Sequence, residues 1–187
     1  MADIGDAAVQ RILEERARNM ARRTAGTAGD GDRMTVLRFH VGESRFGVET
    51  RHVLETCRMD GLAQLPMTPR FVHGVLVLRG RILAVVDLAV ILGLPVPDPS
   101  PADQVVVLRG GHMEFGVRAN TIDGVADVPP PASDASMPAF AGRMAHLFLG
   151  ISGDDLAILD GGRLLAADEL RVSGPSARRV PAAPVEG

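Results

Sequence analysis

The chain has 187 residues, enough to bury a sizeable core without a disulfide or a structural metal. Its 20 basic residues, all arginines, are outweighed by 23 acidic ones, and this balance argues against a dedicated nucleic-acid or anionic-membrane binder. The single cysteine, Cys57, excludes an intramolecular disulfide and a cysteine-rich zinc site. No apolar run approaches the roughly 18 residues of a membrane helix, and the N-terminus lacks a secretory signal, so we expect a cytoplasmic protein without direct membrane insertion.

Residues 3–23 have the spacing of an amphipathic helix, because apolar residues recur every three or four positions. The small, polar, glycine-rich stretch 24–32 predicts a flexible linker. We therefore expect residues 1–33 to be a helix and tether outside a folded body that spans residues 34–172. Residues 173–187 are rich in proline, alanine, serine and arginine, and their composition predicts a disordered tail.

The folded body is expected to be mainly β. Two short apolar runs on either side of Gly42-Glu43-Ser44 predict a hairpin. A second hairpin is predicted by the apolar, β-branched runs 73–78 and 81–88, which flank the Arg79-Gly80 turn.

A short helix is predicted from Leu88 to Leu92, because Gly93 and Pro95 end it. The segment 95–101 contains four prolines and is suited neither to a helix nor to a central strand. It is therefore expected to be an internal connection.

The order of elements then repeats. Phe46-Gly47-Val48 returns as Phe115-Gly116-Val117, and the Leu-Ala-x-x-Asp run that ends at Asp87 returns at Asp160. The sequence separation between the two Leu-Ala-x-x-Asp runs is slightly larger than that between the two Phe-Gly-Val motifs. This difference fits an insertion in the Pro129-Pro130-Pro131 loop. We infer an internal repeat over about residues 34–100 and 103–172, forming two similar small β units whose short, numerous strands favour barrels or sandwiches.

No motif predicts a catalytic, cofactor or metal site. The five histidines are scattered without a metal-binding spacing, and no serine lies in a G-x-S-x-G elbow. Each half closes with a helix-like piece, Ala89-Val90-Ile91-Leu92 in the first and Arg163-Leu164-Leu165-Ala166 in the second. Asp87 and Asp160 stand before these two pieces, where capping is the simplest role. Arg79 has two interpretations: a solvated turn residue, or a contact to a carboxylate or carbonyl group of another protein.

The run from Pro69 to Leu88 resembles the signature of the CheW-type chemotaxis coupling proteins. It contains a proline, an aromatic residue, Gly-Val, a Leu-Arg-Gly turn and a β-rich run into Asp-Leu. Further matches include Phe46-Gly47-Val48 and residues 122–128, so that the resemblance covers about Met34 to Val172. It implies two intertwined five-stranded SH3-like barrels with short connecting helices, in agreement with the internal repeat.

The resemblance also implies a non-enzymatic adaptor without cofactors. Proteins of this family couple transmembrane chemoreceptors to a histidine autokinase, whose regulatory domain has the same double-barrel fold. By resemblance, a hydrophobic groove between the barrels takes the helical tip of the receptor, and the outer faces dock the kinase. This implies recruitment from the cytoplasm to membrane-associated receptor arrays. The positions that the resemblance associates with partner contact are Val53, Glu55, Gly74, Arg79, Gly80, Ile82 and Val125.

Two alternative functions fit the same pattern. A CheW-like adaptor can serve another receptor–kinase pathway, such as surface motility or development, with the same fold and sites. A small β-barrel enzyme or nucleic-acid binder also shares the strand pattern, although the acidic charge and the scarcity of aromatic residues argue against it. The helix at 3–23 is either an accessory recognition element or a helix that is packed on its own barrel or frayed in solution.

Overall fold

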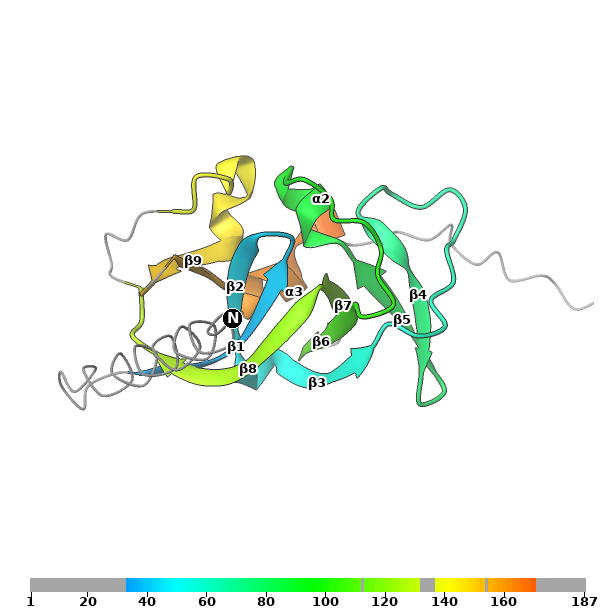
Figure 1. Cartoon of the computed structure of the whole chain (residues 1–187), viewed down its shortest axis with the longest axis horizontal. Helices are drawn as coiled ribbons and strands as arrows, with labels where there is room; N and C mark the ends of the chain where they lie inside the picture. Colours follow the sequence, from blue (N-terminus) through cyan, green and yellow to red (C-terminus); the bar gives the residue numbers. More distant parts are fainter. Residues whose placement is uncertain (1–32, 112, 132–136, 154, 171–187) are drawn as a thin grey trace, which may run out of the picture. The chain divides into compact units, whose positions relative to one another are not determined.

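The computed structural model covers most of the predicted folded body, and its first strand begins at Met34 (Figure 1). The structure describes residues 33–111, 113–131, 137–153 and 155–170. Apart from Arg33, all of these belong to the compact unit that starts at Met34. The predicted helix at 3–23, the linker after it and the tail from residue 173 lie outside the described residues, so the domain boundaries stay predictions.

The described residues form a mainly β structure, as the sequence predicts. The strands are β1 (Met34–Val41), β2 (Ser44–Glu49), β3 (Val53–Arg58), β4 (Val72–Leu78), β5 (Arg81–Val86), β6 (Gln104–Gly110), β7 (Met113–Ala119), β8 (Thr121–Val128), β9 (Phe148–Ser152) and β10 (Leu156–Leu159). The helices are α2 (Leu88–Leu92) and α3 (Gly161–Ala166), with 3-10 turns η1 (Thr50–His52), η2 (Gly142–Leu147) and η3 (Asp168–Leu170). Both predicted hairpins and both short helices are confirmed.

The strands form two five-stranded mixed sheets, with the orders β8-β1-β2-β10-β9 and β3-β6-β7-β5-β4. We call them sheet A and sheet B. When the repeat is aligned, β1 to β5 correspond to β6 to β10, and the two sheets then have the same strand order. Neither sheet comes from one half of the chain, because each joins two strands of one half to three of the other. The two units are therefore intertwined, as the family resemblance implies.

Parallel strand pairs make the exchange between the halves. In sheet A, β2 pairs with β10, and Val48 lies opposite Leu159. In sheet B, β5 pairs with β7, and Val86 lies opposite Val117. The two sequence motifs that repeat, Phe-Gly-Val and Leu-Ala-x-x-Asp, therefore meet across the halves and not within them.

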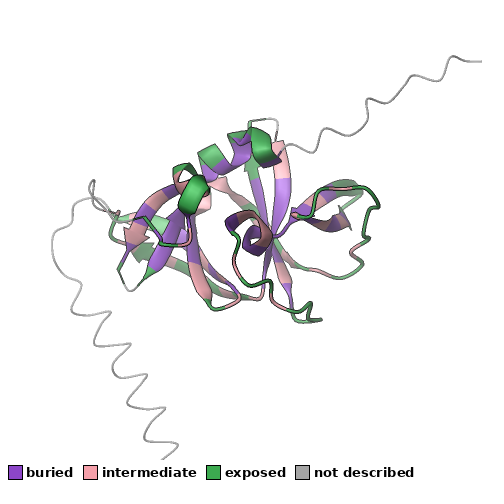
Figure 2. Cartoon of the chain, turned by 90° about the horizontal axis from the view of Figure 1, so that it is seen from above, coloured by how far each residue is buried: buried purple, intermediate pink, exposed green. Residues whose placement is uncertain are grey.

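The continuous apolar run of β6 reflects burial on both faces. Val106 and Leu108 belong to the largest core cluster, which also contains β1 and β2 residues of the other sheet. Val105 and Val107 point into a separate core inside sheet B. Figure 2 shows strands of both sheets largely in the colour of buried residues. Alternate side chains of β6 thus fill two different cores. The larger core, which β6 shares with β1 and β2, holds the two sheets together.

The two predicted caps are confirmed. Asp87 accepts a hydrogen bond of 2.9 Å from the backbone N–H of Ala89 at the start of α2. Asp160 accepts one of 3.0 Å from the backbone N–H of Arg163 in α3. Gly93 ends α2 in the left-handed conformation, with φ of 67°.

Asp87 also belongs to a buried ionic cluster that the sequence does not reveal. The guanidinium of Arg118 on β7 donates to Asp87 at 3.0 Å and to Asp103 at 2.9 Å, and all three side chains are almost fully buried. It also donates to the carbonyls of Pro97 and Asp98, both at 3.0 Å. Arg118 therefore anchors the proline-rich connection between α2 and β6 to sheet B.

Candidate functional site

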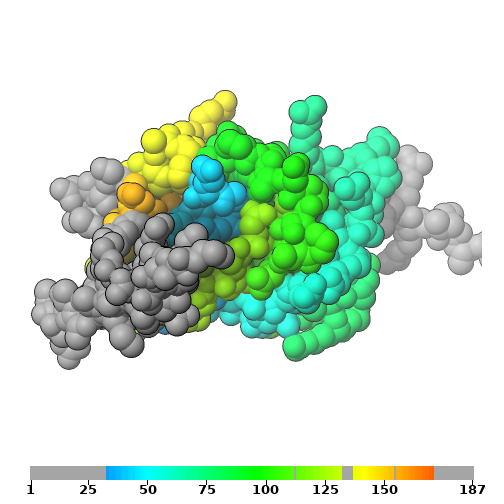
Figure 3. Space-filling model, in the orientation of Figure 1, coloured from blue at the N-terminus to red at the C-terminus, as the bar shows by residue number. Residues whose placement is uncertain are grey.

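The predicted Leu-Arg-Gly turn is the tip of the β4–β5 hairpin. Leu78 pairs with Arg81, so Arg79 and Gly80 form a two-residue loop. Both have positive φ, 51° at Arg79 and 78° at Gly80, as a type I′ turn requires. The glycine adopts this conformation freely, whereas an L-residue such as arginine adopts it at a cost of about 1–2 kcal/mol. In the space-filling view the hairpin forms the lower right-hand part of the folded body (Figure 3).

Arg79 forms an ion pair with Glu55. A guanidinium nitrogen lies 2.8 Å from a carboxylate oxygen of Glu55, whose side chain is 19% exposed while that of Arg79 is 76% exposed. Glu55 is on β3 and Arg79 follows β4, and these strands are the two edges of sheet B. The ion pair therefore joins the two edges of the sheet, while most of the Arg79 side chain remains exposed to solvent.

The outer face of the hairpin carries an exposed apolar pair. Val77 on β4 lies opposite Ile82 on β5, and their exposed fractions are 74% and 78%. Buried Leu76 and Leu83 point to the other face, so the exposed pair follows from the alternation of the two strands. Ile82 was among the predicted contact residues and Val77 was not. Because side chains alternate between the two faces along both strands, the sequence around the turn is enough to place Val77 on the same face as Ile82.

Gly74 is buried on β4 and does not face solvent. A Cβ at this position would lie 2.7 Å from the carbonyl oxygen of Ala63. The close approach permits a two-bond bridge between Ala63 and Val75, with N–O distances of 2.9 and 2.8 Å. Gly74 therefore holds the segment after β3 against the edge of β4.

The other two predicted contact residues lie on the outermost strands of the sheets. Val53 begins β3 and packs partly against the shared core. Val125 lies on β8 of sheet A and is 60% exposed, between Asp123 and Asp127 on the same face of the strand. Six of the predicted residues thus belong to sheet B, and Val125 belongs to sheet A.

Two titratable groups near the hairpin have shifted pKa values. Burial lowers the pKa of His73 below its ordinary 6.5, and nearby Arg118 adds to this effect, while Asp87 and Asp103 oppose it. Burial raises the pKa of the Cys57 thiol, and Glu55 adds to the rise. The described residues contain no cluster of three or more His, Cys, Asp or Glu side chains suited to hold a metal ion. Within the same residues, no helix is both long and apolar enough to cross a membrane.

A family model described as a CheW-like domain matches residues 35–169. The chain belongs to the CheW-like family. It is 39% identical over 125 residues to protein FrzA of Myxococcus xanthus, covering 64% of this chain and 76% of that protein. It is 30% identical over 149 residues to the chemotaxis protein CheW of Klebsiella aerogenes, covering 76% and 88%.

A solved CheW structure shares the fold. The crystal structure of the scaffolding protein TtCheW from Thermoanaerobacter tengcongensis superposes with a TM-score of 0.55 at 21% sequence identity. The match covers 68% of this chain and 88% of that one. The CheW-like fold thus accounts for both sheets and for the exchange of strands between them.

Proposed function

We propose that the protein is a non-enzymatic adaptor that couples chemoreceptors to a histidine autokinase in a chemotaxis-type signalling array, without a cofactor. The observation that carries this proposal is the CheW-like match over residues 35–169, which includes both sheets. Relatives named chemotaxis protein CheW and a solved scaffolding protein support it. Such an adaptor transmits a signal through contacts that differ between the states of its partners.

The outer face of the β4–β5 hairpin is the proposed docking surface for the kinase regulatory domain. An exposed apolar pair beside a charged turn suits a flat protein interface better than it suits water. The receptor tip, a helical hairpin, is assigned to a groove between the barrels, since helices bind proteins through apolar grooves. The adaptor acts in the cytoplasm and is recruited to membrane-associated receptor arrays. The proposed partner contacts are Val53, Glu55, Gly74, Arg79, Gly80, Ile82 and Val125.

Calorimetric titration of the full chain against each partner tests this proposal. Wild-type protein is expected to bind both the kinase regulatory domain and a receptor-tip fragment. The double variant Val77→Asp, Ile82→Asp is expected to lose kinase binding and to keep receptor binding, because both added charges lie on the outer face of the hairpin. Leu65→Asp is the matched control, since Leu65 is also an exposed apolar residue but is outside the proposed contacts. Absence of binding to either partner by the wild type would refute the adaptor function.

A second candidate is an adaptor in a receptor–kinase pathway other than chemotaxis, such as surface motility or development. It is favoured by the 39% identical relative, whose name is FrzA and not CheW. Deletion of the gene in its native organism distinguishes the two candidates. Loss of swimming up an attractant gradient supports chemotaxis, whereas loss of surface spreading or development with intact swimming supports the second candidate.

A further inference from the structure

Arg38 on β1 occupies a position that the other half of the repeat fills with a buried apolar residue. It lies opposite Gly47 of β2. In the other half, Val107 of β6 lies opposite Gly116 of β7. The two glycines are the central residues of the repeated Phe-Gly-Val motifs, so Arg38 and Val107 are equivalent. Val107 is fully buried inside sheet B, and sheet A therefore has a cation where sheet B has part of its core.

Among the described residues, Arg38 has a donor without an acceptor. Its Nε is buried and has no hydrogen-bond partner. No carboxylate of the described residues forms an ion pair with this side chain either. A buried donor without an acceptor costs free energy, and native proteins contain few of them. Because Arg38 as a whole is only half-buried, an acceptor from outside the chain can approach its guanidinium.

Sheet B shows which group the equivalent place of sheet A lacks. Val107 lies opposite Glu55 on the outer strand β3, and Glu55 pairs with Arg79 at 2.8 Å. Arg38 lies opposite Gly124 on the outer strand β8. The outer strand thus carries a carboxylate in sheet B and a glycine in sheet A, where the glycine stands beside a guanidinium that needs an anion.

Gly124 leaves open space on the outer strand beside Arg38. Within the described part of the chain, no neighbouring atom lies within 4 Å of a Cβ built at Gly124. The strand register shifts between Arg38 and Phe39, so that Asp123 is an extra, bulged residue of β8. Bulges of this kind re-aim side chains and are common next to functional sites. Asp123 is not available to Arg38, since its carboxylate is bound to His40 at 3.0 Å.

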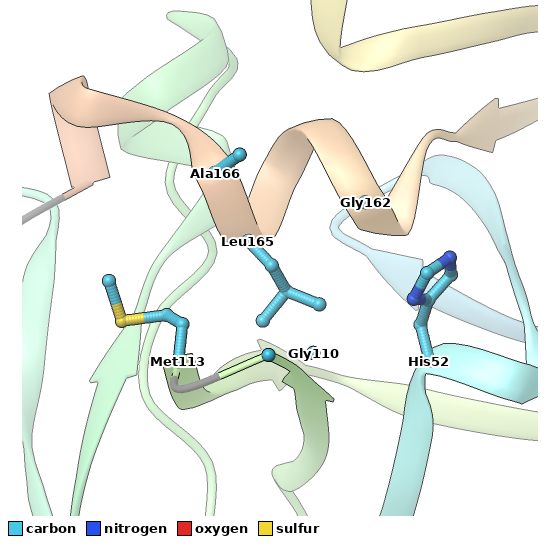
Figure 4. Close-up of a pocket in the computed structure, with 7 residues that line it drawn as sticks. His52, Gly110, Met113, Gly162, Leu165 and Ala166 are labelled. Carbon is cyan, nitrogen blue, oxygen red and sulfur yellow. The ribbon is translucent and has the colours of Figure 1, made fainter.

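A pocket elsewhere in the structure does not offer the same chemistry. It has a volume of about 500 Å³ and opens beside α3, where Leu165 points toward the β6–β7 turn (Figure 4). Its described lining consists of glycines, apolar side chains and His52, and contains no guanidinium and no carboxylate. The place suited to an anion is therefore at Arg38 and not in this pocket.

We propose that the space between Arg38 and Gly124 binds a carboxylate, presented by an aspartate or glutamate side chain of a protein partner. Guanidinium and carboxylate groups match in shape, since two N–H donors can bind two oxygens. The long Arg38 side chain turns toward the carboxylate, and its Nε then gains the acceptor that it lacks. The source is a protein because Gly124 precedes Val125, which is 60% exposed and belongs to the proposed partner contacts. In this last respect the inference rests on the proposed function.

NMR of the free full chain with isotope-labelled arginine tests the site through the Nε–H signal of Arg38. The signal is identified by its absence from the spectrum of Arg38→Met. The probe is glutamate blocked at both backbone ends, and glutamine blocked in the same way is its neutral control. At constant ionic strength, we expect the glutamate to shift the Arg38 signal until it saturates and the glutamine to leave it in place. Equal effects of the two probes, or a stronger response to inorganic phosphate than to glutamate, would overturn the proposal.

A carboxylate on the outer strand itself provides a second test. Gly124→Glu adds this group at the position where sheet B has Glu55, and is expected to shift the Arg38 signal and to abolish its response to the glutamate probe. Gly124→Ala is the matched control, because it has the same unfavourable positive φ of 96° without the charge. It is expected to keep the wild-type response. Equal Arg38 signals in the two variants would contradict the proposed site.

The stability of the free protein shows whether Arg38 already has a partner in its own chain. Arg38→Met keeps the apolar stem and removes the unmatched donor, so its urea midpoint is expected to be unchanged or higher. Arg118→Met is the comparison and is expected to have a lower midpoint, because Arg118 is bound by buried carboxylates. An equally large decrease in Arg38→Met would overturn the proposal.

Calorimetric titration of Arg38→Met against the receptor-tip fragment and the kinase regulatory domain tests the source of the carboxylate. We expect the affinity for one of the two partners to fall about 10-fold or more, as for the loss of a charge-assisted contact. Wild-type affinity for both partners would overturn the assignment to a protein carboxylate. If the wild type binds neither partner, the proposed function and the protein source of the carboxylate both fail, whereas the response of Arg38 to glutamate is measured without either partner.

Discussion

Arg118 shows how one buried side chain can organise a long stretch of backbone. A buried guanidinium is tolerated only when its charge and its donors are all matched. Here two carboxylates and two carbonyl groups provide that match. Because one of the carboxylates also caps α2, the cluster links a helix, a strand and the connection between the two halves.

We expect Arg118→Met to lower the free energy of unfolding by about 3–5 kcal/mol, because Asp87 and Asp103 would be left buried without a cation. Urea denaturation measures the change. The triple variant Arg118→Met, Asp87→Asn, Asp103→Asn removes the unpaired charges and is expected to recover part of the loss. A loss below about 1 kcal/mol in the single variant, the size of an exposed ion pair, would contradict the structural role.

Arg79→Ala is expected to weaken partner binding about 10- to 150-fold, the equivalent of about 1.5–3 kcal/mol for one charge-assisted contact. Its stability is expected to change by less than about 0.5 kcal/mol, since the residue is exposed and alanine keeps the same positive φ. Calorimetric titration and thermal melting measure the two effects. Arg58→Ala is the control, because Arg58 is a similarly exposed arginine paired with Asp60. Unchanged affinity for both partners would reject the contact role.

His73 predicts a pH dependence of stability. Its pKa is lowered in the folded state, mainly by burial, so the unfolded chain takes up the proton first as the pH falls below 6.5. The contribution of His73 to the free energy of unfolding is therefore fully present above pH 6.5. It decreases as the pH falls below 6.5, and the decrease stops once His73 is protonated in the folded state as well. Urea denaturation at pH 7.5 and 5.5 should show a larger loss for wild type than for His73→Gln. Equal losses would mean that burial does not perturb this imidazole.

The secondary-structure elements differ in how well the sequence predicts them. Both hairpins, both short helices and the two capping aspartates follow from local patterns, namely apolar runs, turn residues and repeated Leu-Ala-x-x-Asp. The strands β3 and β8 were not located by periodicity, although the family resemblance included them. Each is an outer strand in which polar residues stand among the apolar ones on the exposed face, so its alternation of apolar and polar residues is weak.

The residue pattern alone predicts neither the exchange of strands, which only the family resemblance implied, nor the buried ionic cluster. The two halves have similar strands, so pairing within a half and pairing between halves predict the same hydrophobic pattern. An arginine in β7 likewise looks the same in a sequence whether it is solvated or buried. For the candidate site, the turn at Arg79 was predictable, whereas its ion pair with Glu55 joins residues far apart in the chain.

At the edge of β4, Gly74→Ala is expected to destabilise the fold by about 1–3 kcal/mol, because the new methyl group would overlap the Ala63 carbonyl. Hydrogen exchange of the Ala63 and Val75 amides should become faster. Gly80→Ala is the comparison, since only its positive φ is unfavourable and no atom lies within 4 Å. It should leave the exchange of these two amides unchanged. Equal exchange in both variants would show that the bridge does not depend on Gly74.

For the whole molecule, we expect residues 34–172 to be the stable unit, because the repeat and every predicted strand lie within this span. Limited proteolysis is expected to remove both ends and to leave this fragment with an unchanged melting temperature. A fragment that unfolds when residues 1–33 are removed would show that the predicted N-terminal helix is part of the domain. Mass spectrometry of the protected fragment gives the boundaries.

The exchange of strands also fixes an order of assembly during synthesis. All five strands of sheet B have left the ribosome soon after Ala119, but sheet A is incomplete until Leu159 emerges. At roughly 5–20 residues per second, the first hairpin waits about 2–8 s for its partner strands after sheet B can close. During that interval Phe39 and Phe46, which are buried in the finished protein, lack part of their cover. The nascent chain therefore passes through a stage in which chaperone binding or aggregation competes with folding, and that stage ends only with the last strand.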